Sequence, residues 1–120
     1  SLELKPDYYD AKFGLAKTYL QEKKDGLGFK LLSELSGQVY DPEVYYELGR
    51  FYYNRGEIDK AIDRFNLALS LAPSHSNSLY SLGIAYEAKG DNARALKYYG
   101  KALELNPGNA EVIKKIKNLK

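Results

Sequence analysis

Cysteine, methionine and tryptophan are all absent from this chain of 120 residues, and so is any long apolar run. Without cysteine the chain forms neither a disulfide nor a thiolate metal site, and its compartment stays open. No stretch approaches the roughly 20 apolar residues of a membrane-spanning helix, so we expect no membrane partner. The formal net charge is only +2, which is too weak a bias to predict nucleic acid or an anionic membrane as the partner.

Groups that could carry catalysis are also scarce. The single histidine, His75, lies between Ser74 and Ser76, and neighbours in a loop rarely have the geometry of a nucleophile and its base. The sequence places no acid that would orient this histidine. It contains no glycine-rich phosphate-binding loop and no metal-ligand spacing. We therefore predict that the protein is not an enzyme and that it has no catalytic residues, no cofactor and no metal.

One pattern in the sequence occurs twice, 34 residues apart. The segment YYELGRFY at 45–52 is matched by LYSLGIAY at 79–86. The same spacing separates Gly56 from Gly90. A fixed period of this length is typical of a stacked helical repeat. The sequence therefore predicts an all-α protein.

Caps, breakers and apolar spacing indicate where the helices begin and end. Asp41 followed by Pro42 is a helix start, because the first residue caps the helix and proline suits its first turn. Gly28 occupies a helical position at which the later copies carry alanine, so we expect it to cost that helix about 1 kcal/mol. The expected helices are 7–22, 26–36, 42–54, 58–71, 76–89, 92–105 and 110–119.

The copies carry the same residue types at the same positions. The third copy has Leu79, Leu82, Gly83, Tyr86, Ala95, Tyr99, Ala102 and Pro107. The second has Tyr45, Leu48, Gly49, Tyr52, Ala61, Phe65, Ala68 and Pro73. An earlier, degenerate copy has Leu15, Ala16, Tyr19, Gly28, Leu32 and Leu35. This pattern resembles the tetratricopeptide repeat, a helix-turn-helix unit of 34 residues. We interpret its signature residues as structural: the small ones allow close helix contact, and the Leu, Tyr and Phe positions fill the core.

The resemblance implies a single domain over 1–120, built as a right-handed superhelix of antiparallel helix pairs. The first helix of each pair would line a concave groove, and the second would face outward. Lys117 falls where Gly49 and Gly83 lie in the earlier copies, so no second helix is expected to pack against the last one. The expected units are the end of a preceding repeat at 1–8, a degenerate repeat at 9–41, repeats at 42–75 and 76–109, and a capping helix at 110–120.

In the family, ligand contacts come from first-helix positions that face the groove. Phe13, Tyr46 and Tyr80 fall at one such position on three successive repeats, and Lys17 and Arg50 follow at the next. Aromatic residues and arginine are enriched in binding hot spots, so we expect a peptide or helix of a partner protein to bind there. The expected partner-binding set is Phe13, Lys17, Tyr46, Arg50, Tyr53, Asn54, Tyr80, Ile84 and Glu87. Further groove-facing positions are Asp10, Leu20, Gln21, Glu43, Asn77, Ala88, Glu111, Lys114 and Asn118.

A purely structural interpretation of these residues stays open. In it, Tyr46 and Tyr80 pack against the neighbouring helix. Arg50 then forms a solvated ion pair with Glu43 or Glu47, which contributes little.

One subclass of the family clamps the terminal carboxylate of chaperone tails with a set of Lys, Asn and Arg side chains. The matching positions of this sequence hold Phe13 and Lys17, then Arg50, then Tyr80 and Ile84. The clamp is therefore absent as a set, which argues against chaperone-tail binding.

The competing function is self-assembly into a homo-oligomer through exposed ends of the repeat stack. The first six residues, SLELKP, match ALELNP at 102–107, so we expect a fragment of a longer array; a natural start with a short capping turn stays open. Leu2 and Leu4 would be poorly buried without a preceding repeat, and an exposed apolar end favours association. A nucleic-acid partner is not expected, since the lysines of the last helix are of the solubilising kind.

Overall fold

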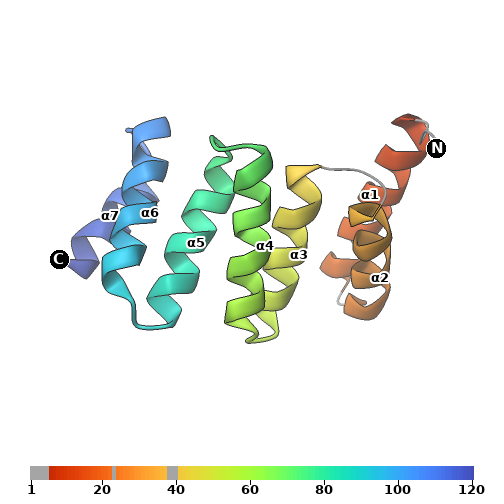
Figure 1. Cartoon of the computed structure of the whole chain (residues 1–120), viewed down its shortest axis with the longest axis horizontal. Helices are drawn as coiled ribbons and strands as arrows, with labels where there is room; N and C mark the ends of the chain where they lie inside the picture. Colours follow the sequence, from red (N-terminus) through yellow and green to blue (C-terminus); the bar gives the residue numbers. More distant parts are fainter. Residues whose placement is uncertain (1–5, 23, 38–40) are drawn as a thin grey trace.

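The computed structural model describes residues 6–22, 24–37 and 41–120, and all regular secondary structure in these ranges is α-helical (Figure 1). In the same ranges no helix is both long and apolar enough to span a membrane. The expected all-α fold is confirmed. The helices are α1 (Pro6–Gln21), α2 (Asp25–Ser36), α3 (Pro42–Asn54), α4 (Ile58–Leu71), α5 (Ser76–Ala88), α6 (Asn92–Leu105) and α7 (Ala110–Leu119).

Within the described ranges the helices form three antiparallel pairs, α1 with α2, α3 with α4 and α5 with α6, followed by α7 (Figure 1). Each helix contacts the next along the chain, so the pairs form a row that measures 48 × 26 × 22 Å. α3 also contacts both α1 and α5, which places the first helices of the pairs on one side of the row. The molecule is therefore an α-solenoid.

Side-chain caps and turn glycines define the helix ends. Asp41 Oδ1 accepts a hydrogen bond from the backbone amide of Glu43 at 2.9 Å, and Asn109 caps α7 in the same way. The turns inside the second and third pairs contain Gly56 and Gly90, whose φ angles are 81° and 82°. Glycine adopts this left-handed conformation without a steric penalty, which explains why it recurs at this turn.

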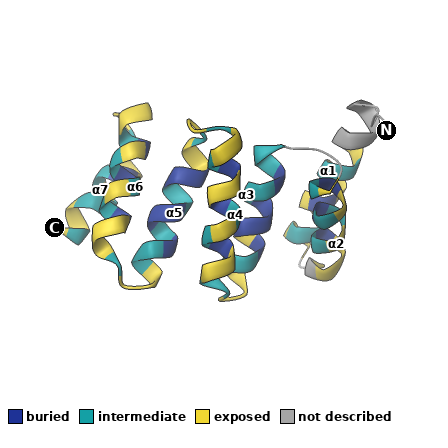
Figure 2. Ribbon diagram, in the orientation of Figure 1, coloured by how far each residue is buried: buried dark blue, intermediate teal, exposed yellow. Residues whose placement is uncertain are grey.

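The core extends along the whole stack between the paired helices (Figure 2). A Cβ atom built on Gly49 would lie 2.5 Å from Cε1 of the buried Phe65 ring. Gly83 has the same relationship to Tyr99, at 2.4 Å. Each glycine therefore lets a large ring of the second helix pack directly onto the backbone of the first helix.

Gly28 has a packing role that the sequence did not indicate. Besides the expected cost in helix propensity, the structure shows Gly28 buried in a tight contact between α1 and α2. A Cβ atom there would lie 2.8 Å from Leu20 Cγ and 3.1 Å from the Ala16 carbonyl oxygen. The first pair is therefore packed so closely at this point that a Cβ atom would require Leu20 to move, whereas the later pairs carry alanine at this position.

Leu15 departs from the expectation that the signature leucines are buried in the core. Its signature position predicts a core residue, yet it is 45% exposed. The equivalent Leu48 is 3% exposed, because it packs with Leu32 and Leu35 of the preceding pair. No described helix precedes α1, so Leu15 has no such cover in this structure.

The two ends of the described stack differ. α1 begins at Pro6, so the expected boundary between residues 8 and 9 falls within this helix. The expected end of a preceding helix, with Leu2 and Leu4, lies outside the described residues. At the other end α7 buries Val112 against the third pair, while Lys117 is exposed.

Candidate functional site

Three adjoining hollows of the described residues lie on the side of the stack where α1, α3, α5 and α7 face solvent. The N-terminal hollow is lined by Lys17, Leu20, Gln21, Glu47, Arg50, Phe51 and Asn54. The central hollow is lined by Tyr46, Arg50, Tyr53, Asn54, Phe65, Tyr80, Ser81 and Ile84. The C-terminal hollow is lined by Tyr80, Glu111, Lys114, Lys115 and Asn118. Because neighbouring hollows share residues, they form one continuous surface, which we call the groove.

The central hollow has a volume of about 220 Å³ and mostly apolar walls. Tyr46 and Tyr53 come from α3, Tyr80 and Ile84 from α5, and Phe65 from α4. The polar lining residues are Arg50, Asn54 and Ser81. Apolar walls with a few placed polar groups are the usual form of a ligand pocket.

Tyr46 and Tyr80 line the central hollow and also pack inward. The ring centroid of Tyr46 lies 6.0 Å from that of Phe65, and the centroid of Tyr80 lies 5.7 Å from that of Tyr99. Both tyrosines are half-buried. The packing that the structural interpretation expects is therefore present, and it holds the same two rings at the hollow.

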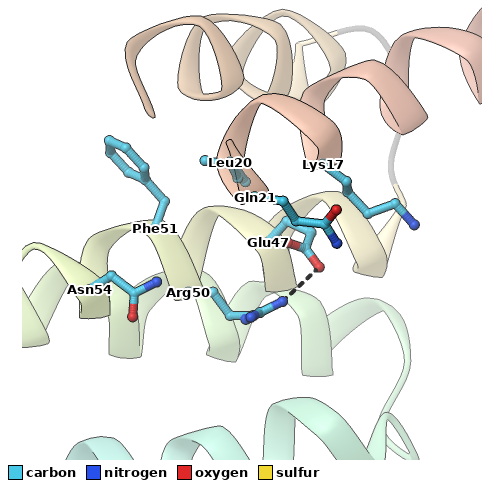
Figure 3. Close-up of a pocket in the computed structure, with 7 residues that line it drawn as sticks. All are labelled: Lys17, Leu20, Gln21, Glu47, Arg50, Phe51 and Asn54. Atoms are coloured by element: carbon cyan, nitrogen blue, oxygen red, sulfur yellow. Dashed lines mark hydrogen bonds and ion pairs between the residues drawn. The ribbon is translucent and has the colours of Figure 1, made fainter. Parts of the chain in front are cut away.

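Figure 3 shows the N-terminal hollow between α1 and α3. The side chain of Glu47 is only 9% exposed and accepts a hydrogen bond from Arg50 Nη1 at 3.5 Å. Burial raises the pKa of Glu47, and the positive charges of Arg50 and Lys17 offset part of that shift. Arg50 thus pairs with Glu47 as the structural interpretation expects, whereas Glu43 contacts His75 instead.

Lys17 lies on the exposed side of α1, with its Nζ atom 4.7 Å from the ring centroid of Phe13. In Figure 3 its amine points away from Glu47 and Arg50. No carboxylate of the described residues lies within 4.0 Å of this amine. Lys17 is therefore a cation of the groove without an ion-pair partner in the described part of the chain.

Glu87 lies beside the third pair and serves the core. The buried Tyr99 donates its hydroxyl hydrogen to Glu87 Oε1 at 2.9 Å. Burial, and then the hydrogen bond to Glu87, strongly raise the pKa of Tyr99. Burial also raises the pKa of Tyr80, and the negative charges of Glu111 and Glu87 add to that shift.

The structure brings most of the predicted set together. Tyr46, Arg50, Tyr53, Asn54, Tyr80 and Ile84 surround the central hollow, and Lys17 lines the next one. Phe13 and Glu87 line none of the three hollows. Sequence reasoning missed Glu47, Phe51, Phe65, Ser81 and Lys115. Glu47 and Ser81 occupy the same repeat position, 34 residues apart, but this position has no role in the family pattern that could have indicated them.

His75 has partners that the sequence did not indicate. Its Nδ1 atom lies 2.7 Å from Ser78 Oγ, and its Nε2 atom lies 2.5 Å from Glu43 Oε1. Nδ1 also accepts a hydrogen bond from the Ser78 amide, so the ring caps α5 and ties it to α3. Ser78 is fully buried, and its hydroxyl is closed to a substrate in this structure. In the described residues no cluster of His, Asp and Glu is arranged to hold a metal ion.

The stacked pairs and the groove define a helical-repeat protein with an extended surface on one side. The model of the tetratricopeptide repeat family matches residues 40–107, more than half of the chain. The chain belongs to the tetratricopeptide repeat family.

Two curated relatives show how far the sequence similarity extends. Anaphase-promoting complex subunit 3 of Dictyostelium discoideum is 35% identical over 83 residues, which cover 68% of this chain and 9% of that protein. Protein IFIT1 homolog B of Homo sapiens is 27% identical over 93 residues, which cover 74% of this chain and 19% of that protein. The chain thus spans less than a fifth of the length of either relative.

Solved structures with the same fold include two peptide complexes. The first tetratricopeptide domain of Spaghetti (RPAP3), bound to the HSP90 peptide SRMEEVD, has a TM-score of 0.90 at 19% identity, covering 99% of this chain and 95% of that one. The secretion chaperone SycD of Yersinia enterocolitica, in complex with a peptide of the translocator YopD, has a TM-score of 0.89 at 20% identity, covering 98% and 96%. At these identities the similarity shows the fold alone.

Proposed function

We propose that this protein is a non-catalytic interaction module whose groove binds a segment of a partner protein. The central hollow carries the proposal. Its walls come from two successive repeats, so a ligand side chain placed there contacts α3 and α5 at once. Tyrosine and arginine, which border this hollow, are the residue types most enriched in binding hot spots.

The rigidity of the hollow supports this function. The rings of Tyr46 and Tyr80 are held from below by Phe65 and Tyr99, which are buried in the core. Walls fixed in this way need little ordering when a ligand binds, and this lowers the entropic cost of association. The peptide complexes of RPAP3 and SycD are consistent with such a role, since both have this fold.

A peptide library tests the proposal. Random 12-residue peptides displayed on phage are selected on the wild-type protein, and the affinities of synthetic copies are measured for wild type, Ile84→Asp and Leu67→Asp. Ile84 lines the central hollow, whereas Leu67 is 38% exposed on α4 and lines none of the hollows. We expect Ile84→Asp to weaken binding at least about tenfold, because a charge replaces an apolar wall, and Leu67→Asp to leave binding unchanged. Failure to select peptides, or equal binding by Ile84→Asp, would contradict the proposal.

Self-association is a second candidate, and the exposure of the α1–α2 face favours it. Leu15 and Leu27 are 45% and 49% exposed there. Leu27 is apolar at a position where the later repeats carry the charged residues Lys60 and Arg94. These two exposed leucines are the apolar surface of the first helix pair through which a second copy would associate. Sedimentation from micromolar to millimolar concentration tests self-association. A strict monomer contradicts it, and an oligomer that dissociates in the Leu15→Glu variant supports it.

A further inference from the structure

We infer that the partner segment carries one large apolar side chain and, about three to five residues away, an aspartate or glutamate. The apolar side chain fills the central hollow, and the carboxylate pairs with Lys17. This inference rests on the proposed function of the groove and adds the chemistry of its ligand.

The central hollow selects an apolar side chain. Tyr46, Tyr53, Tyr80 and Ile84 form its walls, and its volume of about 220 Å³ exceeds the cavity of about 150 Å³ that holds a benzene ring. A leucine, methionine or phenylalanine side chain therefore has room there. Burial of such a side chain strengthens binding by about tenfold to a hundredfold.

The negative charges of the groove are already engaged. The groove carboxylates whose side chains the structure describes each have a polar or charged neighbour within the chain. Glu43 contacts His75, Glu47 contacts Arg50 and Glu87 contacts Tyr99, and the negative charge of Glu111 lies close enough to Tyr80 to raise its pKa. Lys17 differs, because no described carboxylate lies within 4.0 Å of its amine. Lys17 is therefore the cation that an incoming carboxylate can neutralise at this end of the groove.

The residues between the hollows determine the direction in which a carboxylate is attracted. Arg50 borders both the central and the N-terminal hollow, so a segment that runs from one to the other passes a positive charge. Tyr80 borders both the central and the C-terminal hollow, and the negative charge of Glu111 beside it raises its pKa. A segment that runs that way passes a negative charge. The C-terminal hollow also holds Lys114 and Lys115, but Glu111 lies beside Tyr80 where the central hollow adjoins it. We therefore assign the acidic residue to the route past Arg50 to Lys17.

The distance between the two contacts sets the spacing in the ligand. Lys17 is on α1, and the central hollow lies between α3 and α5. Packed helices lie about 8–10 Å apart, and an extended chain advances about 3.3 Å per residue, so about four residues bridge the two contacts. The positions that match the family's clamp for a terminal carboxylate hold Phe13, Lys17, Arg50, Tyr80 and Ile84, so the clamp is absent as a set. We therefore assign the charge to a side chain within the segment.

A charge swap with a matched control tests the inference. Lys101 is a close match for Lys17, because each is exposed and lies four residues before the end of its helix. Each also lies over an aromatic ring, Lys101 at 5.5 Å from the Tyr98 centroid. Peptides selected on the wild-type protein are resynthesised with Asp, Asn or Lys at the acidic position, and their affinities are measured at low and high salt.

We expect the wild-type protein to prefer the Asp peptide over the Lys peptide by about threefold to tenfold, with the preference weakening at high salt. Lys17→Glu should reverse the preference, Lys17→Gln should abolish it, and Lys101→Glu should leave it unchanged. An unchanged preference in Lys17→Glu overturns the inference, as does a set of selected peptides without an acidic residue. A reversal by Lys114→Glu in place of Lys17→Glu also overturns it.

Two further measurements separate this inference from the proposed function. Amidation of the peptide C-terminus should leave the affinity unchanged, and a loss would show that the chain end supplies the charge. Binding that depends on Ile84 but not on Lys17 removes the acidic contact and leaves the groove as the binding surface. Binding that ignores Ile84 contradicts both.

Discussion

Tyr99 donates a hydrogen bond to Glu87 across 2.9 Å, and the preceding repeat holds Phe65 and Tyr53 at the equivalent positions. The buried ring therefore carries a hydroxyl where the first helix offers a carboxylate acceptor, and it lacks one in the repeat without that carboxylate. A buried hydroxyl without an acceptor costs more than the hydrogen bond itself contributes. The two residues form one structural unit, although Glu87 was predicted as a groove residue.

The hydrogen bond between Tyr99 and Glu87 predicts that substitutions of its donor and of its acceptor lower the free energy of unfolding by different amounts. Tyr99→Phe should lower the free energy of unfolding by about 1 kcal/mol or less, because Glu87 then turns to solvent. Glu87→Leu should cost about 1–3 kcal/mol, since the Tyr99 hydroxyl loses its acceptor. In urea unfolding, the double variant should be more stable than Glu87→Leu alone. Additive effects would show that the two side chains are not coupled.

The burial of Glu47 predicts a pH dependence of stability. Its pKa is raised above the ordinary value of 4.5 by burial. A carboxyl group with a raised pKa contributes fully below its unfolded value, and the contribution is lost as the pH rises through the folded value. Glu47→Gln should therefore be more stable than wild type at pH 7, and the difference should vanish below about pH 4.

Urea midpoints between pH 3 and pH 8 measure this effect, with the exposed Glu104→Gln on α6 as the control. The opposite result, a wild type more stable than Glu47→Gln at pH 7, would mean that the pair with Arg50 outweighs the burial of the carboxylate.

Gly28 and Gly14 predict opposite effects of the same substitution. Alanine favours a helix over glycine by about 0.5–1 kcal/mol. A Cβ atom at Gly14 meets no atom within 4 Å, so Gly14→Ala should stabilise the protein by about that amount. At Gly28 the Cβ atom would meet Leu20 and the Ala16 carbonyl oxygen, so Gly28→Ala should destabilise it by about 1–3 kcal/mol. Thermal unfolding of both variants decides this, and a stabilising Gly28→Ala would show that the contact relaxes.

Leu48 and Leu15 occupy the same repeat position and should respond differently. Leu48→Ala should cost about 2–5 kcal/mol, because the removed side chain leaves a cavity in the core. Leu15→Ala should cost less than about 1 kcal/mol, since that side chain is 45% exposed. A large loss for Leu15→Ala in chemical unfolding would show that another surface covers it in solution.

The repeat period explains what the sequence could predict. Positions 34 residues apart have the same neighbours in a regular stack, so one pattern predicted the helices of the described ranges to within one or two residues. Leu15 was misassigned because its burial depends on a preceding repeat and not on its own position. The packing role of Gly28 could not be predicted, because the approach of α1 to α2 depends on how Leu20 packs, which the repeat pattern does not contain.

The repeat period also explains why only part of the groove could be predicted. Tyr46 and Tyr80 were found because they share one repeat position that faces the groove. Glu47 was missed because its repeat position has no role in the family pattern. The other two repeats hold the small residues Gly14 and Ser81 at this position. The burial of Glu47 follows from the fit of α1 against α3, which only the three-dimensional structure shows.

A heteronuclear NMR titration of the labelled protein with a library-selected peptide tests the central claim most directly. If the groove binds the peptide, we expect the shifted resonances to cluster on the groove residues Lys17, Tyr46, Arg50, Tyr80 and Ile84. Shifts confined to Leu15, Leu27 and their neighbours, growing with protein concentration, would contradict binding by the groove and indicate self-association through α1 and α2.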